Sequence, residues 1–197
     1  MMVMTSTSRM IKLFTLILML ISMVGCASVK MSPPSASADT LHKLRAANLA
    51  SSSVGEFGLA PGLKPGLDKS LGGLRGMSLQ SANGSFSQQL KDTVIVELKA
   101  AGLYDEKSEL QIEAQLLENQ VNAAITTGSA KLAANFTVDK AGKRVFEKSF
   151  SVDSQWDSSF IGDIAVPEAI NRYSSLYRQL VAKLFDDKDF QITLARE

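Results

Sequence analysis

The chain has 197 residues, enough for one domain of ordinary size, and its 21 basic and 20 acidic residues give a net charge of +1. This balance argues against a nucleic-acid binder, whose surface carries a basic patch or stripe. The single cysteine excludes an intramolecular disulfide. The single histidine, His42, excludes multi-histidine metal sites and a Ser-His-Asp triad centred elsewhere in the chain.

The first 25 residues have the three parts of a secretory signal. Arg9 and Lys12 form a short basic head, an almost wholly apolar run extends from Leu13 to Val24, and small residues follow it. A spanning helix needs roughly 20 apolar residues, and the run from Leu13 to Val24 is shorter than that. An uncleaved membrane helix is therefore the less favoured interpretation. We expect residues 1–25 to be removed. Because Arg9 and Lys12 are their only charged residues, the remaining 172 residues carry a net charge of −1.

A cysteine stands directly after this signal-like run. The tetrapeptide Met23-Val24-Gly25-Cys26 resembles the bacterial lipobox, the signal-peptidase site of lipoproteins, although Met23 replaces the usual Leu. In that family the cysteine thiol is joined to diacylglycerol, and the amine freed by cleavage is acylated. The resemblance therefore implies lipid attachment at Cys26, for which a free or buried thiol is the alternative. Two or three acyl chains, palmitate among them, hold a protein firmly at a membrane.

The residues after Cys26 bear on localisation and on spacing from the membrane. In proteobacterial lipoproteins an Asp directly after the cysteine often retains the protein in the inner membrane. Ala27 therefore implies, by resemblance, a protein of the outer membrane whose domain faces the periplasm. The small and polar segment Ala27–Ala38 predicts a flexible tether, and a short helix over Asp39–Leu49 would follow it. The predicted divisions are a signal peptide at 1–25, a lipidated N-terminus with tether and short helix at 26–52, and a single α+β domain at 53–197.

Residues 51–84 hold eight of the 13 glycines. They contain neither a GxGxxG fingerprint after a clear strand nor a Walker pattern, so their glycines are a weak signal for a phosphate-binding loop. Short strands near residues 54–57 and 74–79 fit the pattern. The pattern favours one irregular edge strand followed by a loop.

The signals are sharper from Ser85 onward. A capping box begins at Ser85, apolar residues then recur at helical spacing, and Gly102 is a typical helix end, which together predict a helix over 86–101. Apolar and polar residues alternate in three later segments, as in antiparallel strands with one wet face. These segments are 110–116, 130–138 and 146–156, with a hairpin turn at 139–142.

An apolar stripe along residues 166–185 predicts a second long helix, with Pro167 in its first turn. The alternation of Phe190, Ile192 and Leu194 predicts a short strand after it. Because an apolar sheet face needs a cover, we expect an α+β fold in which an antiparallel sheet of three to five strands is covered on one face by two helices.

The most distinctive stretch of the mature chain is Ser154–Asp163, which links the third of these strands to the last helix. Trp156 and Phe160 within it are candidate contacts for a partner or a ligand, because aromatic side chains contribute strongly to interfaces. The favoured alternative makes Trp156 the end of the core and Phe160 a plug between helix and sheet, because most Trp and Phe side chains are substantially buried.

The sequence predicts no catalytic, cofactor-binding or metal-binding residues, and no enzyme. Glu109 and Glu113 fall on the polar face of a strand, where carboxylates are solvated. Tyr173 and Tyr177 are one helical turn apart, and core packing is favoured over stacking on a sugar or a lipid. The serines stand in no G-x-S-x-G elbow.

The element order after residue 53, behind a lipobox, resembles a group of small envelope lipoproteins. The group includes the lipopolysaccharide-assembly lipoprotein, the auxiliary lipoproteins of ABC-type lipid-trafficking systems, and the YajG-type outer-membrane lipoproteins. The resemblance covers Val54–Phe190 and includes the segments Leu110-Gln-Ile-Glu-Ala-Gln-Leu and Ala130-Lys-Leu-Ala-Ala-Asn-Phe.

The resemblance implies binding or complex assembly at the periplasmic face. We therefore expect an adaptor or auxiliary subunit of an envelope transport or assembly system. Its partners would be the membrane, through the lipid anchor, and an envelope protein complex, but not nucleic acid. The alternative is a periplasm-facing binding module for a glycolipid or a peptidoglycan ligand.

Overall fold

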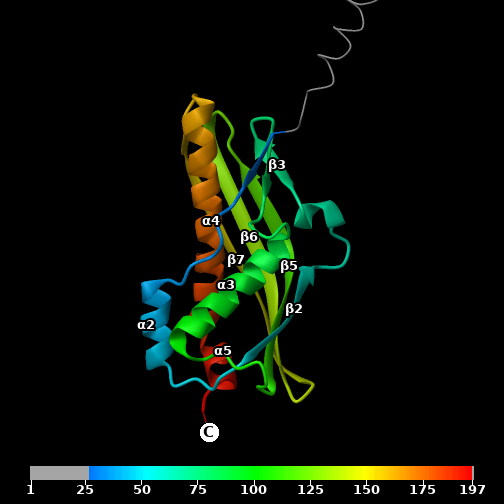
Figure 1. Ribbon diagram of the computed structural model, residues 1–197, viewed down its shortest axis with the longest axis vertical. Helices are drawn as coiled ribbons and strands as arrows, with labels where there is room; N and C mark the ends of the chain where they lie inside the picture. The colour runs from blue at the N-terminus through cyan, green and yellow to red at the C-terminus, as the bar shows by residue number, and fades with distance from the viewer. Residues whose placement is uncertain (1–26, 197) are drawn as a thin grey trace, which may run out of the picture.

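The computed structural model describes residues 27–196, which form two β-sheets and the helices that pack on them (Figure 1). The elements in chain order are β1 (Ser28–Lys30), α2 (Ala38–Ala46), β2 (Ser53–Leu59), the 3-10 helix η1 (Pro65–Asp68), β3 (Leu71–Leu74), β4 (Met77–Gln80), α3 (Phe86–Ala101), β5 (Leu110–Asn122), β6 (Thr126–Lys140), β7 (Lys143–Ser158), α4 (Gly162–Asp186) and α5 (Lys188–Thr193).

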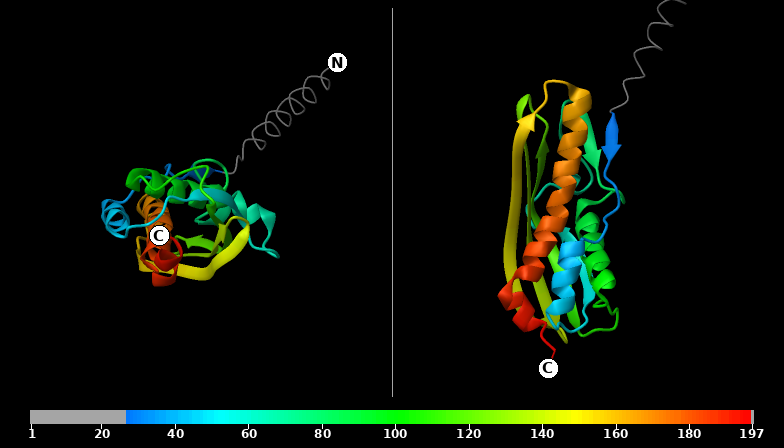
Figure 2. Two further views of the ribbon diagram at one scale, coloured as in Figure 1. Left: turned by 90° about the horizontal axis from the view of Figure 1, so that it is seen from below. Right: turned by 90° about the vertical axis from the view of Figure 1, so that its left-hand side faces the viewer.

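The larger sheet has the strand order β2-β5-β6-β7. Strands β5, β6 and β7 are antiparallel neighbours, whereas β2 lies parallel to β5. Helix α3 packs across β2, and α4 packs along β6 and β7 on the same face (Figures 1 and 2). The predicted α+β class is confirmed. The sheet is mixed because the chain passes through β3, β4 and α3 between β2 and β5.

Strand β5 shows how the sequence pattern builds the core. Ile112 and Leu116 are 0% and 1% exposed and face the helices. A bulge between Leu116 and Glu118 then shifts the register by one residue. Beyond the bulge, Asn119 and Val121 are the buried residues. The bulge therefore lets one long strand keep its buried face although the simple alternation stops.

The smaller sheet, β1-β4-β3, reaches the end of β5. The amide of Ala123 donates to the carbonyl of Gly73 at 2.8 Å. A Cβ at Gly73 would lie 2.2 Å from the carbonyl oxygen of Val121, and its φ of +95° is one that side chains disfavour. Glycine is thus required where the two sheets meet.

Helix α3 has the bounds predicted for it. Ser85 caps its start by accepting a hydrogen bond from the amide of Gln88 at 3.1 Å. Gly102 ends it with a left-handed φ of 75°. The predicted later strands and the last helix are also present, each longer than its sequence pattern.

The N-terminal segment packs along the domain. Strand β1 pairs with β4, Met31 is 3% exposed, and Leu44 and Leu49 are each 2% exposed. The structure differs here from the predicted flexible tether over residues 27–38. The segment is ordered because pairing satisfies its backbone groups and the core takes up its apolar side chains.

Two further segments differ from the sequence-based expectations. Residues 51–84 form three strands, β2, β3 and β4, where one edge strand and a loop were expected. Residues 188–193 form helix α5, so the predicted strand at 190–194 is wrong. Asp187 caps α5 and accepts from the amide of Phe190 at 3.1 Å, so a local cap prevailed over the period-two pattern.

Candidate functional site

The described chain begins at the end of the molecule where α4 starts (Figures 1 and 2). Ala27 is already tied to the fold, because its carbonyl accepts a hydrogen bond from the amide of Ser78 at 3.1 Å. From there β1 runs parallel to β4, with Ser28 opposite Ser78. The predicted lipid-attachment residue, Cys26, lies just outside the described residues. The structure therefore places the residue next to Cys26 directly on the domain.

Four large apolar side chains are exposed at this end. We call them the apex patch: Ile125 is 57% exposed, Phe160 77%, Ile161 57% and Ile164 54%. Ile125 lies in the turn between β5 and β6, Phe160 and Ile161 lie between β7 and α4, and Ile164 lies in the first turn of α4. Among the described residues, only Val145 and Ile192 are other large apolar side chains with comparable exposure.

Arg75 fixes the two loops that carry the apex patch. Its Nε donates to the carbonyl of Ala123 at 2.7 Å, and its Nη1 donates to the carbonyl of Phe160 at 2.7 Å. Its Nη2 donates to the carbonyls of Ala124 and Ser159. One guanidinium thus joins the β5–β6 turn to the β7–α4 loop through charge-assisted hydrogen bonds.

An apolar groove of about 550 Å³ lies beside the apex patch. Its walls come from β1, from the β3–β4 turn with β4, and from the first turns of α4. The apolar lining residues are Val29, Met77, Val166, Pro167 and Ile170, and the polar ones include Arg75, Asp163 and Asn171. This lining suits an acyl chain or an apolar protein segment better than a polar metabolite.

The two aromatic candidates predicted from the sequence have different environments. Trp156 is 7% exposed, and its ring lies so close to Gly128 that a Cβ there would be 2.2 Å from the ring. Arg172 of α4 lies over the same ring at 6.0 Å. Phe160 is exposed, so it does not plug the space between helix and sheet. Contact of either residue with a partner stays a prediction.

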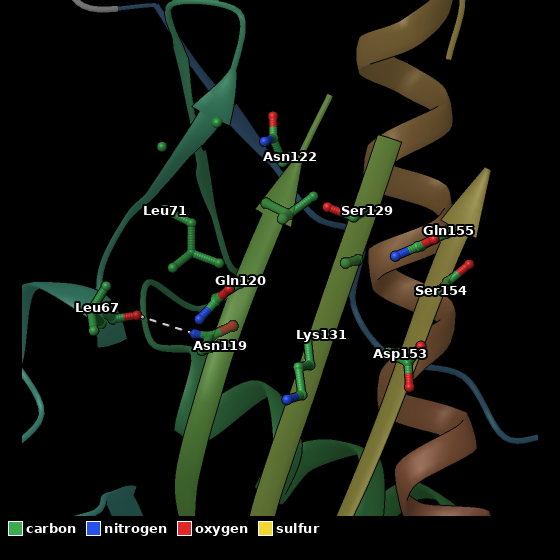
Figure 3. A pocket seen from close by; sticks show the side chains of 14 residues that line it. Leu67, Leu71, Asn119, Gln120, Asn122, Ser129, Lys131, Asp153, Ser154 and Gln155 are labelled. Atoms are coloured by element: carbon green, nitrogen blue, oxygen red, sulfur yellow. Dashed lines mark hydrogen bonds between the residues drawn. The ribbon is translucent and has the colours of Figure 1, made fainter. Parts of the chain in front are cut away.

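A polar cleft of about 640 Å³ lies where η1 and β3 meet β5, β6 and β7 (Figure 3). Lys131 on β6 and Asp153 on β7 are partners in the strand register at its edge. Lys131 bonds Glu118 at 2.7 Å, and this hydrogen bond raises the pKa of Lys131. The lysine of the cleft is therefore paired with a carboxylate of the neighbouring strand β5.

A buried hydrogen-bond chain lies behind this cleft. The Asn119 amide donates to the carbonyl of Leu67 at 3.2 Å (Figure 3), and the Tyr173 hydroxyl donates to Asn119 and contacts the Tyr177 hydroxyl at 2.8 Å. Burial raises the pKa of both tyrosines. The two hydroxyls stay protonated and join α4 to β5, as expected of core packing rather than ligand stacking.

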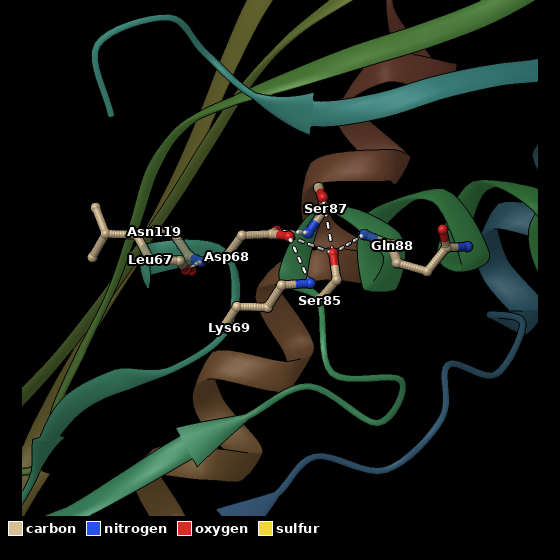
Figure 4. Close-up of polar contacts among 7 residues, drawn as sticks. All are labelled: Leu67, Asp68, Lys69, Ser85, Ser87, Gln88 and Asn119. Atoms are coloured by element: carbon tan, nitrogen blue, oxygen red, sulfur yellow. Dashed lines mark hydrogen bonds and ion pairs between the residues drawn. The ribbon is translucent and has the colours of Figure 1, made fainter. Parts of the chain in front are cut away.

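A second polar cluster surrounds the start of α3 (Figure 4). The Asp68 carboxylate accepts from the Ser85 hydroxyl at 2.6 Å and from the Ser87 amide at 2.8 Å, with Lys69 at 3.8 Å. Burial alone would raise the pKa of Asp68, but these donors leave it lowered. The carboxylate is fully engaged in holding the helix start and is a structural group.

The described residues contain no group of three or more His, Cys, Asp and Glu side chains that could hold a metal ion. Nor does any helix among residues 27–196 have the length and apolar character needed to cross a membrane. At its apex the fold exposes an apolar surface.

The comparisons with known proteins concern the fold. Neither a protein-family model nor a curated protein matches the chain. Among solved structures, protein XCC0632 from Xanthomonas campestris, described with the family model DUF330, is similar at a TM-score of 0.52. The two are 15% identical over 85% of this chain and 92% of that chain. A minor lipoprotein from Acinetobacter baumannii is similar at 0.39, with 12% identity over 70% and 93% of the two chains. The chain thus shares its fold with XCC0632.

The sequence named Phe160 as a candidate contact but favoured a buried position for it, and it did not predict the exposed patch around Phe160. The available signal was apolar residues in segments where turns are expected: Ile125 after a strand, and Ile161 beside Gly162. Arg75, which joins the loops, carried no signal because its partners are backbone carbonyls far away in the sequence.

Proposed function

We propose that the protein is a lipid-anchored envelope protein without catalytic activity, acting as an adaptor or auxiliary subunit of an envelope transport or assembly system. The anchor is Cys26, and the domain faces the periplasm from the outer membrane. The observation that carries the proposal is the apolar groove between β4 and α4, lined in part by Val29, three residues after Cys26.

The position of the groove supports an adaptor held at the membrane. Ala27 is bonded to β4, so a lipid on Cys26 would hold the groove close to the membrane surface. Groove walls from three elements form a preformed site, which needs little ordering when an apolar segment binds. The other clusters described above are occupied by their own internal hydrogen bonds.

A second function is favoured by the same lining. Met77, Val166 and Ile170 would accept an acyl chain, so the domain would bind a glycolipid of the envelope. The two functions differ in what copurifies with the protein: a protein subunit for the adaptor, or a lipid for the binding module.

Lipid anchoring is tested by Cys26→Ser. The wild type should sediment with membranes and migrate on gels as an acylated protein, whereas the variant should be found in the soluble fraction. A variant that still sediments with membranes and keeps the wild-type mobility would contradict lipidation.

The groove is tested by Met77→Lys, which places a charge among the apolar walls while the long side chain can reach solvent. Val145→Lys is the matched control, because Val145 is 42% exposed on β7, outside the groove lining. The copurifying subunit, or the lipid found by mass spectrometry, should be lost from Met77→Lys and kept by Val145→Lys. Equal retention by both variants would contradict a role for the groove.

A further inference from the structure

The anchoring geometry determines which end of the domain lies nearest to a membrane. Ala27 is held by the domain, because its carbonyl accepts a hydrogen bond from the Ser78 amide. Consecutive Cα atoms are about 3.8 Å apart, so no flexible linker separates Cys26 from the domain. This step rests on the proposed lipidation of Cys26. With the acyl chains of Cys26 in a bilayer, the end of the domain that carries β1 must face that bilayer.

The apex patch lies at this same end. Phe160 and Ile161 lead into α4, which starts at this end of the molecule (Figure 1). Arg75 ties their loop to the turn that carries Ile125. The guanidinium holds the loops by their backbone, and the apolar side chains of these loops are exposed. A patch fixed in this way loses little conformational freedom when it is buried.

The charges beside the patch indicate an apolar rather than an electrostatic contact. Asp157 and Asp163 are exposed ionisable side chains within three residues of Phe160. The Arg75 guanidinium beside the patch donates to the backbone carbonyls of the loops. Carboxylates are not attracted to anionic headgroups, whereas basic groups are. The contact would therefore depend on burial of apolar area, and salt would change it little.

We propose that the apex patch inserts into the interfacial region of the same bilayer leaflet that holds the acyl chains of Cys26. Amphipathic helices at a membrane surface bury their apolar side chains about 5–10 Å into the boundary between headgroups and acyl chains, and we expect a similar depth for these loops. The domain then has two attachments, one covalent and one by its loops. The second attachment fixes the rotation of the groove relative to the membrane plane.

Single-cysteine labelling tests the insertion. Cys26 is the only cysteine of the chain, so in the lipidated protein an introduced cysteine is the only free thiol. Phe160→Cys would carry an environment-sensitive fluorophore at the apex. Ile192→Cys is the matched control, because Ile192 is 74% exposed on α5 at the opposite end (Figure 1).

The labelled, lipidated proteins are reconstituted into phosphatidylcholine vesicles with and without phosphatidylglycerol. The label at residue 160 should shift to shorter emission wavelengths and be quenched by lipids carrying a nitroxide at a shallow position, in both kinds of vesicle and at low and high salt. The label at residue 192 should show neither effect.

A double substitution tests the same contact by removing apolar side chains from the apex patch. Phe160→Asp with Ile161→Asp, labelled through Ile164→Cys, should lower the inserted fraction by about tenfold or more, because two apolar side chains no longer gain from burial. Cosedimentation with vesicles should persist through the lipid. Ile192→Asp, labelled through the same Ile164→Cys, should leave the inserted fraction unchanged.

The failures are distinguishable. Wild-type protein that does not cosediment with vesicles overturns the proposed anchoring and this inference with it. Protein that cosediments while the labels at residues 160 and 192 stay equally aqueous overturns the insertion alone. A blue shift at residue 160 that needs no vesicles and grows with protein concentration would assign the patch to a second copy of the chain and overturns the insertion as well.

Discussion

At the scale of single residues, the contact between Gly128 and Trp156 determines how β6 and β7 pack. Gly128 lies opposite Trp156 in the strand register, and the indole occupies the space of the missing Cβ. Gly128 thus leaves room for the indole of Trp156 to lie against the backbone of β6.

Gly128→Ala should destabilise the protein by about 1–3 kcal/mol, because its Cβ would force Trp156 out of its place. Gly58→Ala is the control, since a Cβ on this strand residue meets nothing within 4 Å. Urea unfolding followed by Trp156 fluorescence would measure both. Equal stability of the two variants would show that the indole moves aside without cost.

A second prediction at this scale concerns pH and the Asp68 carboxylate. Its pKa is lowered from 3.8 by hydrogen bonds from Ser85 and Ser87 that outweigh its burial. A lowered pKa in the folded state means that the ionised form stabilises the fold above pH 3.8, and that this stabilisation is lost as the pH falls through the lowered value.

Asp68→Asn should therefore reduce the free energy of unfolding at pH 7 by about 1 kcal/mol, because it removes the charge that strengthens the hydrogen bonds from Ser85 and Ser87. The difference between wild type and variant should shrink as the pH falls below 3.8. Denaturant unfolding at a series of pH values measures it. A difference that does not change with pH would mean that the charge of Asp68 contributes nothing.

At the scale of elements, α5 depends on a cap that also forms an ion pair. The Asp187 carboxylate accepts from the Phe190 amide and bonds Lys148 of β7 at 2.6 Å. Asp189 also bonds Lys148, at 2.9 Å, but is 71% exposed in its side chain. Both aspartates bond Lys148, but only Asp187 caps α5.

Asp187→Ala should lower stability by about 1–2 kcal/mol, because it removes the cap of α5. Asp189→Ala should cost less than about 0.5 kcal/mol, since it removes only an exposed ion pair. Thermal unfolding followed by circular dichroism compares them. If the two variants lose the same stability, the ion pair with Lys148, and not the cap, holds α5.

At the scale of the whole molecule, the segment before β2 and the C-terminal segment are joined by hydrogen bonds. The Ala50 amide donates to the Leu194 carbonyl at 2.7 Å, and the Arg196 amide donates to the Asn48 carbonyl at 3.2 Å. Leu49 between them is 2% exposed. The segment before β2 is therefore part of the cooperative core.

Leu49→Ala should cost about 2–5 kcal/mol, as for a buried leucine. Leu41→Ala, at a half-buried position of α2, should cost clearly less. Unfolding monitored by Trp156 fluorescence would measure this loss of stability. Trp156 lies in β7, but it reports on the whole domain if the domain unfolds cooperatively. A neutral Leu49→Ala would mean that residues 28–52 behave as a separate tether.

The sequence by itself determined α3, the three antiparallel strands and α4. The reason is that their signals are local: the Ser85 cap, Gly102, strict alternation and an apolar stripe act within one element. The sequence also indicated the lipobox at Cys26, which lies outside the described residues, and it singled out Phe160.

Only the tertiary structure decided the rest. The pairing of β1 with β4 and the three strands in the glycine-rich segment depend on partners distant in sequence. The helix at residues 188–193 has a local cap in Asp187, which the period-two pattern of Phe190, Ile192 and Leu194 concealed. The exposure of Phe160, and the hold of Arg75 on the backbone of its loop, are likewise seen only in the folded chain. Periodicity cannot express such contacts, because it describes one element at a time, whereas the apex of this molecule is made by four segments that only the folded chain brings together.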